Sequence, residues 1–319
     1  MSKSTLEIFN VIILISIDVC ALTGNCMIIL AFIIGPKSLK TLTNYFVVNL
    51  AVADLMVAIL PLPFWIAYQI DYNIINRNAV YFFITTDVLF GITSILSLTA
   101  ISLERMFAVK FPTRHFNLSS ALVFIVIAFT WFIGIVFSVA QFFISFQNVR
   151  WYIAFLLVFA YIFPLFIIVV SYCIIYCAIR MMRDNSNQDG KTKQELRVAK
   201  IISIIIGLFF ICWSPFFILN TVHLFCKEVY CRKLPIWLIN ITKMLHYSHS
   251  MMNFFVYGYR SPDFRHIFRA FLKCRLSLMQ GRVRSLSESI NLEQSSSFKR
   301  ERNIENSEEV LVTLASDEI

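Results

Sequence analysis

Charged side chains are scarce in this chain of 319 residues. Only 15% of the residues are Asp, Glu, Lys or Arg, whereas 58% are hydrophobic. Soluble globular domains contain about 25% charged and about 45–50% apolar residues, so the composition predicts a membrane protein. The sequence also lacks a recognisable set of nucleophile, base and oxyanion donors, and it lacks a metal-ligand cluster. We therefore expect neither an enzyme nor a bound cofactor.

A cleavable signal peptide is also missing. The first apolar run, near 8–34, is too long for one and has no small-residue cleavage site, so we interpret it as a membrane anchor. Internal repeats are not evident either. Repeats and broken helix pairs would favour a transporter, so a transporter or channel is the less favoured class.

Apolar runs long enough to cross a bilayer occur seven times along the sequence. They lie near 8–34, 42–69, 78–109, 119–143, 151–180, 198–226 and 234–258. The predicted fold is therefore all-α, a bundle of seven transmembrane helices. Because seven is odd, we expect the two termini on opposite sides of the membrane.

Basic residues concentrate in the loops on one side of these runs, and the net charge is +9. Lys37, Lys40, Lys110 and Arg114 are examples. This distribution is typical of cytoplasmic loops, and it accounts for the positive charge without a nucleic-acid partner. We predict a multi-pass protein of the plasma membrane, with an extracellular N-terminus and a cytoplasmic C-terminus.

The residues after the seventh run predict a helix that lies along the membrane surface, over 261–273. Its apolar residues recur at helical spacing, with basic residues between them, and are Phe264, Ile267, Phe268, Phe271 and Leu272. Cys274 is a candidate palmitoylation site, and an unmodified thiol is the alternative. Residues 1–274 would then form the membrane domain, and 275–319, rich in Ser, Glu and Arg, a disordered cytoplasmic tail.

Asp87 and Arg105 are two charges in the third apolar run. They are eighteen residues apart, which is five helical turns, so both side chains lie on one face of the helix. At 1.5 Å per residue they are separated by about 27 Å, close to the thickness of the hydrocarbon core. Ionisable groups in a bilayer usually face the bundle interior. The pair predicts a cation-binding carboxylate near one membrane face and a switch near the other.

Other distinctive residues follow a set order along the seven runs. They are Gly24–Asn25, LAVAD ending at Asp54, Glu104–Arg105, Trp131, Pro164 with Tyr172, CWSP from Cys212 to Pro215, and Asn253 with Tyr257. Each motif is weak alone, but in this order they resemble the rhodopsin-like (class A) G-protein-coupled receptors over roughly residues 8–274. The resemblance implies a receptor that binds a ligand from outside and activates a heterotrimeric G protein inside.

Within that family the chain is most similar to the receptors for biogenic and trace amines. The resemblance implies that Asp87 binds a ligand ammonium, that Tyr247 hydrogen-bonds this carboxylate, and that aromatic residues enclose the ligand ring. The implied pocket comprises Asp87, Val88, Trp213, Phe216, Phe217, Asn220, Lys243 and Tyr247. A charge-assisted hydrogen bond and a cation–π contact of about 0.5–2 kcal/mol would hold the cationic ligand.

Lys243 leaves a second interpretation of Asp87 open. It lies one turn outward of Tyr247, so it could pair with Asp87, compete with a cation, or favour an anionic or zwitterionic ligand. The stretch 156–160 has no hydroxyl group, which disfavours a catecholamine. A peptide, a lipid or another small molecule remains the alternative ligand. A retinal pigment is disfavoured because Tyr247 occupies the position of the lysine that such pigments use.

The resemblance also implies a switch at the cytoplasmic end. Its residues are Glu104, Arg105, Tyr172, Glu195, Asn253 and Tyr257. In the family the sixth helix moves outward and frees the arginine for the G protein, with Trp213 and Pro215 as relays. The alternative for Glu195 is a solvated acid near a helix start. The serine clusters of the tail suggest arrestin and receptor kinases as further partners.

Asp54, Ser94, Ser250 and Asn253 match the sodium site of many such receptors. His249 stands where an asparagine is usual, which argues against bound sodium. Asp54 would then be protonated, or hydrogen-bonded to Asn25 and Asn253.

The disulfide that is usual in this family cannot form. Val80 occupies the position of one cysteine, and residues 132–172 contain none. Cys226 and Cys231, in CKEVYC, could instead form a disulfide if their loop faces an oxidising compartment.

Overall fold

Apolar runs form helices in a bilayer because a helix satisfies its backbone hydrogen bonds internally. The computed structural model describes residues 5–71, 73, 76–143, 149–185, 189–225, 235–260, 265 and 267–269. Within these residues the regular structure is entirely helical, which confirms the all-α prediction. The elements are α1 (Thr5–Ile34), η1 (Lys37–Leu39), α2 (Leu42–Ile59), α3 (Pro61–Ile70), α4 (Arg77–Lys110), α5 (Pro112–Phe116), α6 (Ser120–Ala140), η3 (Gln141–Phe143), α7 (Val149–Leu156), η5 (Leu157–Ile162), α8 (Phe163–Asn185), α9 (Asp189–Phe225) and α11 (Ile236–Arg260).

Each predicted apolar run corresponds to one of these helices or to a consecutive group of them. Among the described residues, five segments are long and apolar enough to cross a membrane, namely Glu7–Ile34, Leu42–Ile70, Asn78–Lys110, Ser120–Phe143 and Arg150–Met181. In α9 the apolar segment within the described residues is Gly207–His223. α11 is less apolar because it carries buried polar side chains, among them Lys243 and Asn253.

Three of the runs are not regular α-helices throughout, which the apolar pattern did not predict. The fourth run ends in the 3-10 helix η3. The second run is divided into α2 and α3 at Pro61, whose nitrogen has no hydrogen to donate and whose ring disfavours helical backbone at the residue before it. The fifth run contains the π-helix η5 between α7 and α8. The π-helical turn directs Ala160 and Tyr161 into the bundle and leaves Val158 and Phe159 exposed.

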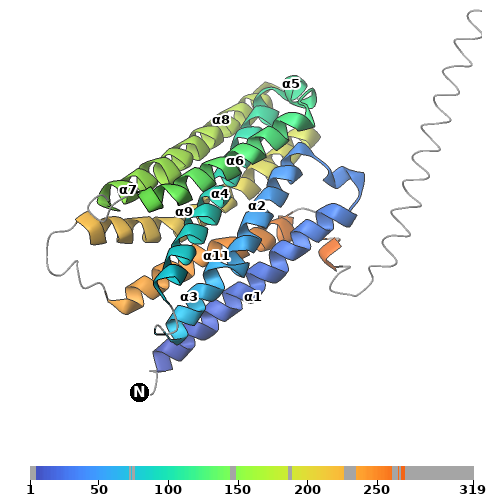
Figure 1. Ribbon diagram of the computed structural model, residues 1–319. Helices are drawn as coiled ribbons and strands as arrows, with labels where there is room; N and C mark the ends of the chain where they lie inside the picture. Colours follow the sequence, from blue (N-terminus) through green and yellow to red (C-terminus); the bar gives the residue numbers. More distant parts are fainter. Residues whose placement is uncertain are drawn as a thin grey trace, which may run out of the picture.

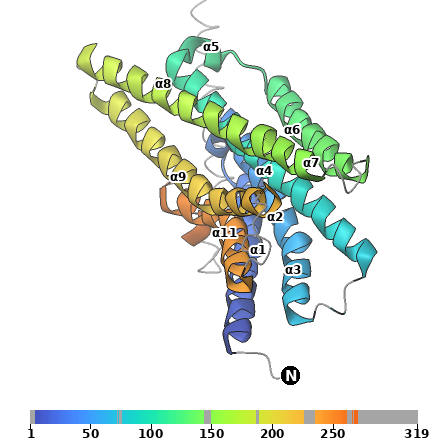
Figure 2. The same cartoon turned by 90° about the vertical axis from the view of Figure 1, so that its left-hand side faces the viewer.

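α4 lies at the centre of the bundle. It packs against α2, α6 and α8, while α1 packs against α2 and α11, and α9 packs against α8 and α11 (Figure 1). The start of α1 and α3 lie at one end of the bundle, and α5 lies at the other end (Figures 1 and 2). The two ends of α4 therefore belong to different faces of the molecule, as the spacing of Asp87 and Arg105 predicts.

Buried amides connect neighbouring helices. Asn49 on α2 donates to Ser97 on α4 at 2.7 Å, and it accepts a hydrogen bond of 2.8 Å from the Trp131 indole on α6. Asn25 on α1 donates to the backbone oxygen of Ser250 on α11 at 2.9 Å. These bonds satisfy polar groups that would be costly if left unpaired in hydrocarbon.

The described part of the predicted surface helix comprises residues 265 and 267–269, which are helical. Ile267 and Phe268 are buried in the bundle core, where Phe268 packs on Phe254 with ring centroids 4.9 Å apart. Arg265 and Arg269 are exposed. The rest of 261–273, Cys274 and the tail 275–319 lie outside the described residues.

Candidate functional site

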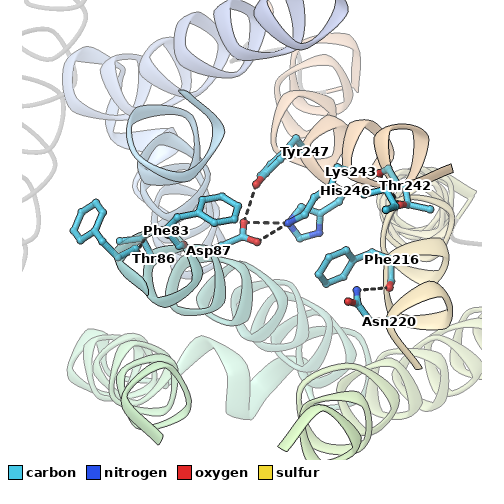
Figure 3. A network of polar contacts seen from close by, with 11 residues as sticks. Phe83, Thr86, Asp87, Phe216, Asn220, Thr242, Lys243, His246 and Tyr247 are labelled. Atoms are coloured by element: carbon cyan, nitrogen blue, oxygen red, sulfur yellow. Dashed lines mark hydrogen bonds and ion pairs between the residues drawn. The ribbon is translucent and has the colours of Figure 1, made fainter. Parts of the chain in front are cut away.

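Asp87 on α4 forms an ion pair with Lys243 on α11. The Lys243 Nζ atom lies 2.8 Å from Asp87 Oδ2, and the Tyr247 hydroxyl donates a hydrogen bond of 3.2 Å to Asp87 Oδ1 (Figure 3). The side chains of Asp87 and Lys243 are each only 11% exposed. The carboxylate of the predicted pocket therefore already holds an ammonium, which belongs to the chain itself.

His246 is a third α11 residue that faces this carboxylate. Its Nε2 atom lies 3.6 Å from Asp87 Oδ1. It is not among the predicted pocket residues, although it follows Lys243 by three residues and Tyr247 follows Lys243 by four, so all three share one helix face. Its ring packs against Trp213 and Phe216, with centroid distances of 4.3 and 4.7 Å.

Aromatic rings surround the Lys243 ammonium. They belong to Phe216, Tyr247, Phe83 and Trp65, whose centroids lie 4.7, 5.2, 5.3 and 5.5 Å from Nζ. Phe216 and Tyr247 belong to the predicted pocket, whereas Phe83 on α4 and Trp65 on α3 were not predicted. Ring faces attract cations, and most strongly where water is excluded. We call Asp87, Lys243 and these four aromatic residues the ion-pair cage.

The other predicted pocket residues lie around the cage rather than in it. Trp213 is buried under His246 and packs on Gly91, where an added Cβ would lie 2.9 Å from the indole. Phe217 stacks on Tyr161 at 4.6 Å and belongs to the core between η5 and α9. Asn220 is half-buried beside Phe216, to whose backbone oxygen its amide donates, and Val88 is half-buried next to Asp87.

Asp54 on α2 lies at the centre of a second polar cluster. Ser94 and Ser250 each donate to its Oδ1 atom at 3.0 Å, and Asn253 donates to Oδ2 at 2.6 Å. The four residues of the predicted sodium site are therefore together. The expected bond from Asn25 to Asp54 is absent among the described contacts, because the Asn25 amide donates to the backbone oxygens of Ala21 and Ser250 instead.

Glu104 is the centre of a third cluster, at the other end of α4. Thr43 on α2 donates to both carboxylate oxygens at 2.9 Å, and Arg105 Nε lies 3.0 Å from Oε2. His115 on α5 lies 2.7 Å from Oε1. Glu104 and Arg105 were both predicted switch residues, but Thr43 and His115 were missed because they come from other elements.

Residues 24–257 match the family model described as "7 transmembrane receptor (rhodopsin family)". The chain belongs to this receptor family. The canine adenosine receptor A2a is 29% identical over 295 residues, which cover 81% of this chain and 71% of the relative. The chicken adenosine receptor A2b is 28% identical over 303 residues, which cover 83% of this chain and 88% of the relative. The octopamine receptor beta-2R of Drosophila melanogaster is 25% identical over 334 residues, covering 84% and 61% of the two chains.

The family membership confirms that the chain is a membrane-spanning receptor and not an enzyme.

Some predicted residues of this rhodopsin-family receptor lie outside the part of the chain that the structure describes. The side chains of Glu195 on α9 and Tyr257 on α11 lie outside the described residues, as do Cys226 and Cys231. Tyr172 on α8 is half-buried against the core. The role of Glu195 in the switch and the loop disulfide therefore stay predictions.

Proposed function

We propose that this receptor binds a small molecule whose ammonium group pairs with Asp87, and that the bound ligand activates a heterotrimeric G protein. The observation that supports this most directly is the ion-pair cage, which already accommodates a primary ammonium between a carboxylate, a tyrosine hydroxyl and aromatic rings. A ligand ammonium requires the same partners. The ligand binds from the extracellular side of the plasma membrane, where the N-terminus lies.

The fifth membrane span restricts the rest of the ligand. Its inward-facing residues in η5 are Ala160 and Tyr161, and the Tyr161 hydroxyl is hydrogen-bonded to Ser214. A ligand ring with several hydroxyl groups would find few free hydrogen-bond partners on these residues. The ligand is therefore an aromatic amine with few or no ring hydroxyls, with Trp213 and Phe216 next to its ring and Phe217 behind them.

The ligand acts on the cytoplasmic end by changing the position of α9. Pro215 interrupts the hydrogen-bond ladder of this helix, so the helix can bend beneath the cage. Outward movement of α9 opens the space next to Arg105. Arg105 then separates from Glu104 and contacts the G protein, with support from Tyr172 and Tyr257. The ligand drives this change only if it binds the active state more tightly than the inactive state. Arrestin and receptor kinases bind through the tail.

A nucleoside is the second candidate ligand, because the similar proteins include receptors named for adenosine. Asn220 next to Phe216 offers an amide, and amides can pair bidentately with the edge of an adenine. Such a ligand is uncharged, so it would leave the pair of Asp87 and Lys243 intact.

The test is an Asp87→Asn variant of the full-length receptor, with phenethylamine, tyramine, tryptamine and adenosine as ligands and cyclic AMP and calcium as readouts. We expect amine potency to fall about 100-fold, or about 2.7 kcal/mol. Asp71→Asn is the matched control, because Asp71 ends α3 and contacts Asn73 rather than the cage. Amine responses that survive in Asp87→Asn would refute the proposal. Adenosine responses that survive while amines are inactive on the wild type would establish the second candidate.

A further inference from the structure

The ion-pair cage is electrically balanced before any ligand arrives. It contains one carboxylate, Asp87, and one ammonium, Lys243, separated by 2.8 Å. A ligand that brings only an ammonium makes a cage with two positive charges and one negative charge. A ligand that brings both signs replaces one ion pair with two and leaves the total charge unchanged.

We propose that the ligand is a zwitterion, whose ammonium binds Asp87 and whose carboxylate binds Lys243. This inference rests on the proposed function of Asp87, and it adds a role for Lys243 as the residue that recognises the anionic group. The class that fits is an aromatic amino acid or a close derivative of one.

The described residues offer a displaced Lys243 no second carboxylate nearby. Among the described residues, its ion pair with Asp87 is its single contact with a carboxylate. The other groups around Nζ are the rings of Phe216, Tyr247, Phe83 and Trp65, which attract a cation but carry no net charge. Asn240 lies one turn outward of Lys243 on α11, and its side-chain oxygen accepts a hydrogen bond of 2.8 Å from the Gln69 amide. Both side chains are neutral. A buried ammonium without a counter-charge is unfavourable, so a monoamine binds weakly.

His246 strengthens the distinction between the two kinds of ligand. Its Nε2 atom lies 3.6 Å from Asp87, so the carboxylate already faces positive or hydrogen-bonding groups on several sides. A second ammonium next to Lys243 adds repulsion at short range, whereas an adjacent ligand carboxylate offsets it. The ring of the amino acid then lies against Trp213 and Phe216, which pack on His246.

The test uses three probes with the same ring and different charges: phenylalanine, phenethylamine and 3-phenylpropionate. The readouts are thermal stabilisation of the purified full-length receptor and G-protein activation measured with a panel of Gα subunits. On the wild type we expect phenylalanine to act at about tenfold lower concentration than phenethylamine, because it forms both ion pairs. We expect 3-phenylpropionate to be weakest. Tryptophan, tryptamine and indole-3-propionate repeat the series with a larger ring.

Lys243→Met reverses the expected order, because Asp87 then needs a cation and the described part of the cage contains no second cation for the carboxylate of the zwitterion. We expect phenethylamine to gain about tenfold or more and phenylalanine to lose a similar factor. Lys243→Arg, which keeps the charge, should retain the preference for phenylalanine. If Lys243→Met does not fold, Lys243→Gln replaces it as the neutral variant. The comparison of the three probes on the wild type tests the proposal without any variant.

The outcomes separate this inference from the proposed function. If phenethylamine is at least as potent as phenylalanine on the wild type while Asp87→Asn removes both responses, the zwitterion is refuted and the amine site stands. If Asp87→Asn leaves both responses unchanged, or if neither ring series stabilises the receptor, both proposals are refuted.

Discussion

His115 Nε2 on α5 lies 2.7 Å from Glu104 Oε1 on α4, so a residue of the short loop helix holds the acid that neighbours Arg105. Glu104 also accepts from Thr43 and pairs with Arg105, so three side chains from three helices hold one carboxylate. The position of Arg105 therefore depends on α2 and α5 as well as on its own helix.

Neutralising Glu104 should raise signalling in the absence of agonist. In Glu104→Gln the ion pair with Arg105 is lost, and Arg105 becomes available to the G protein. We expect agonist-independent activity to rise about fivefold, which corresponds to about 1 kcal/mol in the balance between the two states. The measurement is basal G-protein activation at matched surface expression.

His115→Phe gives a graded comparison for that variant, because it keeps a ring on α5 but removes the bond to Glu104. Thr43 and Arg105 still hold the carboxylate, so the rise should be smaller than in Glu104→Gln. If neither variant has a higher basal activity than the wild type, the cluster does not restrain Arg105.

The pair of Asp87 and Lys243 should contribute strongly to stability when only one partner is removed. Lys243→Met leaves a buried carboxylate unpaired, and Asp87→Asn leaves a buried ammonium unpaired, so each should lower the free energy of unfolding by about 3–5 kcal/mol. The double variant removes both charges and should be more stable than either single variant. Thermal unfolding of the purified receptor without ligand measures this coupling, and additive losses would contradict it.

Gly91 should be needed for the position of Trp213. In Gly91→Ala the new Cβ lies 2.9 Å from the indole, which must move away from α4. We expect a loss of about 1–3 kcal/mol in stability and a changed agonist efficacy. Gly207→Ala is the matched control, since no described atom lies within 4 Å of its new Cβ. That variant should be neutral or more stable by about 1 kcal/mol, because alanine favours helix.

Sodium should have little effect on agonist affinity. Asp54 already accepts three hydrogen bonds, and His249, which packs on Phe209 and Trp213, provides no oxygen ligand. We expect agonist affinity to change by about twofold or less when NaCl replaces choline chloride at constant ionic strength. Radioligand competition measures it, and a decrease in affinity of about tenfold that Asp54→Asn removes would contradict the prediction.

The helices could be predicted from the sequence because hydrocarbon allows few other structures for a long apolar run. The division at Pro61 followed from the geometry of proline and could have been predicted. The π-helix at 157–162 could not, because a change from i+4 to i+5 hydrogen bonding leaves no clear mark in residue order.

The candidate site was predictable in its centre but less so in its surroundings. Asp87, Tyr247 and Phe216 are together as the resemblance implied, and the pairing with Lys243 was one of two interpretations left open. His246 could have been found from helical spacing alone. Phe83, Trp65, Thr43 and His115 could not, because their contacts depend on how separate helices pack.

Lys243 is tethered to the backbone of α11, so its ammonium faces Asp87 at a local concentration that dilution cannot lower. Under the proposed function, a simple amine must displace Lys243 from Asp87 before it can bind, so amines at low concentration should leave the receptor unoccupied. A receptor built in this way would ignore background amines and respond to a ligand that also supplies an anionic group for Lys243.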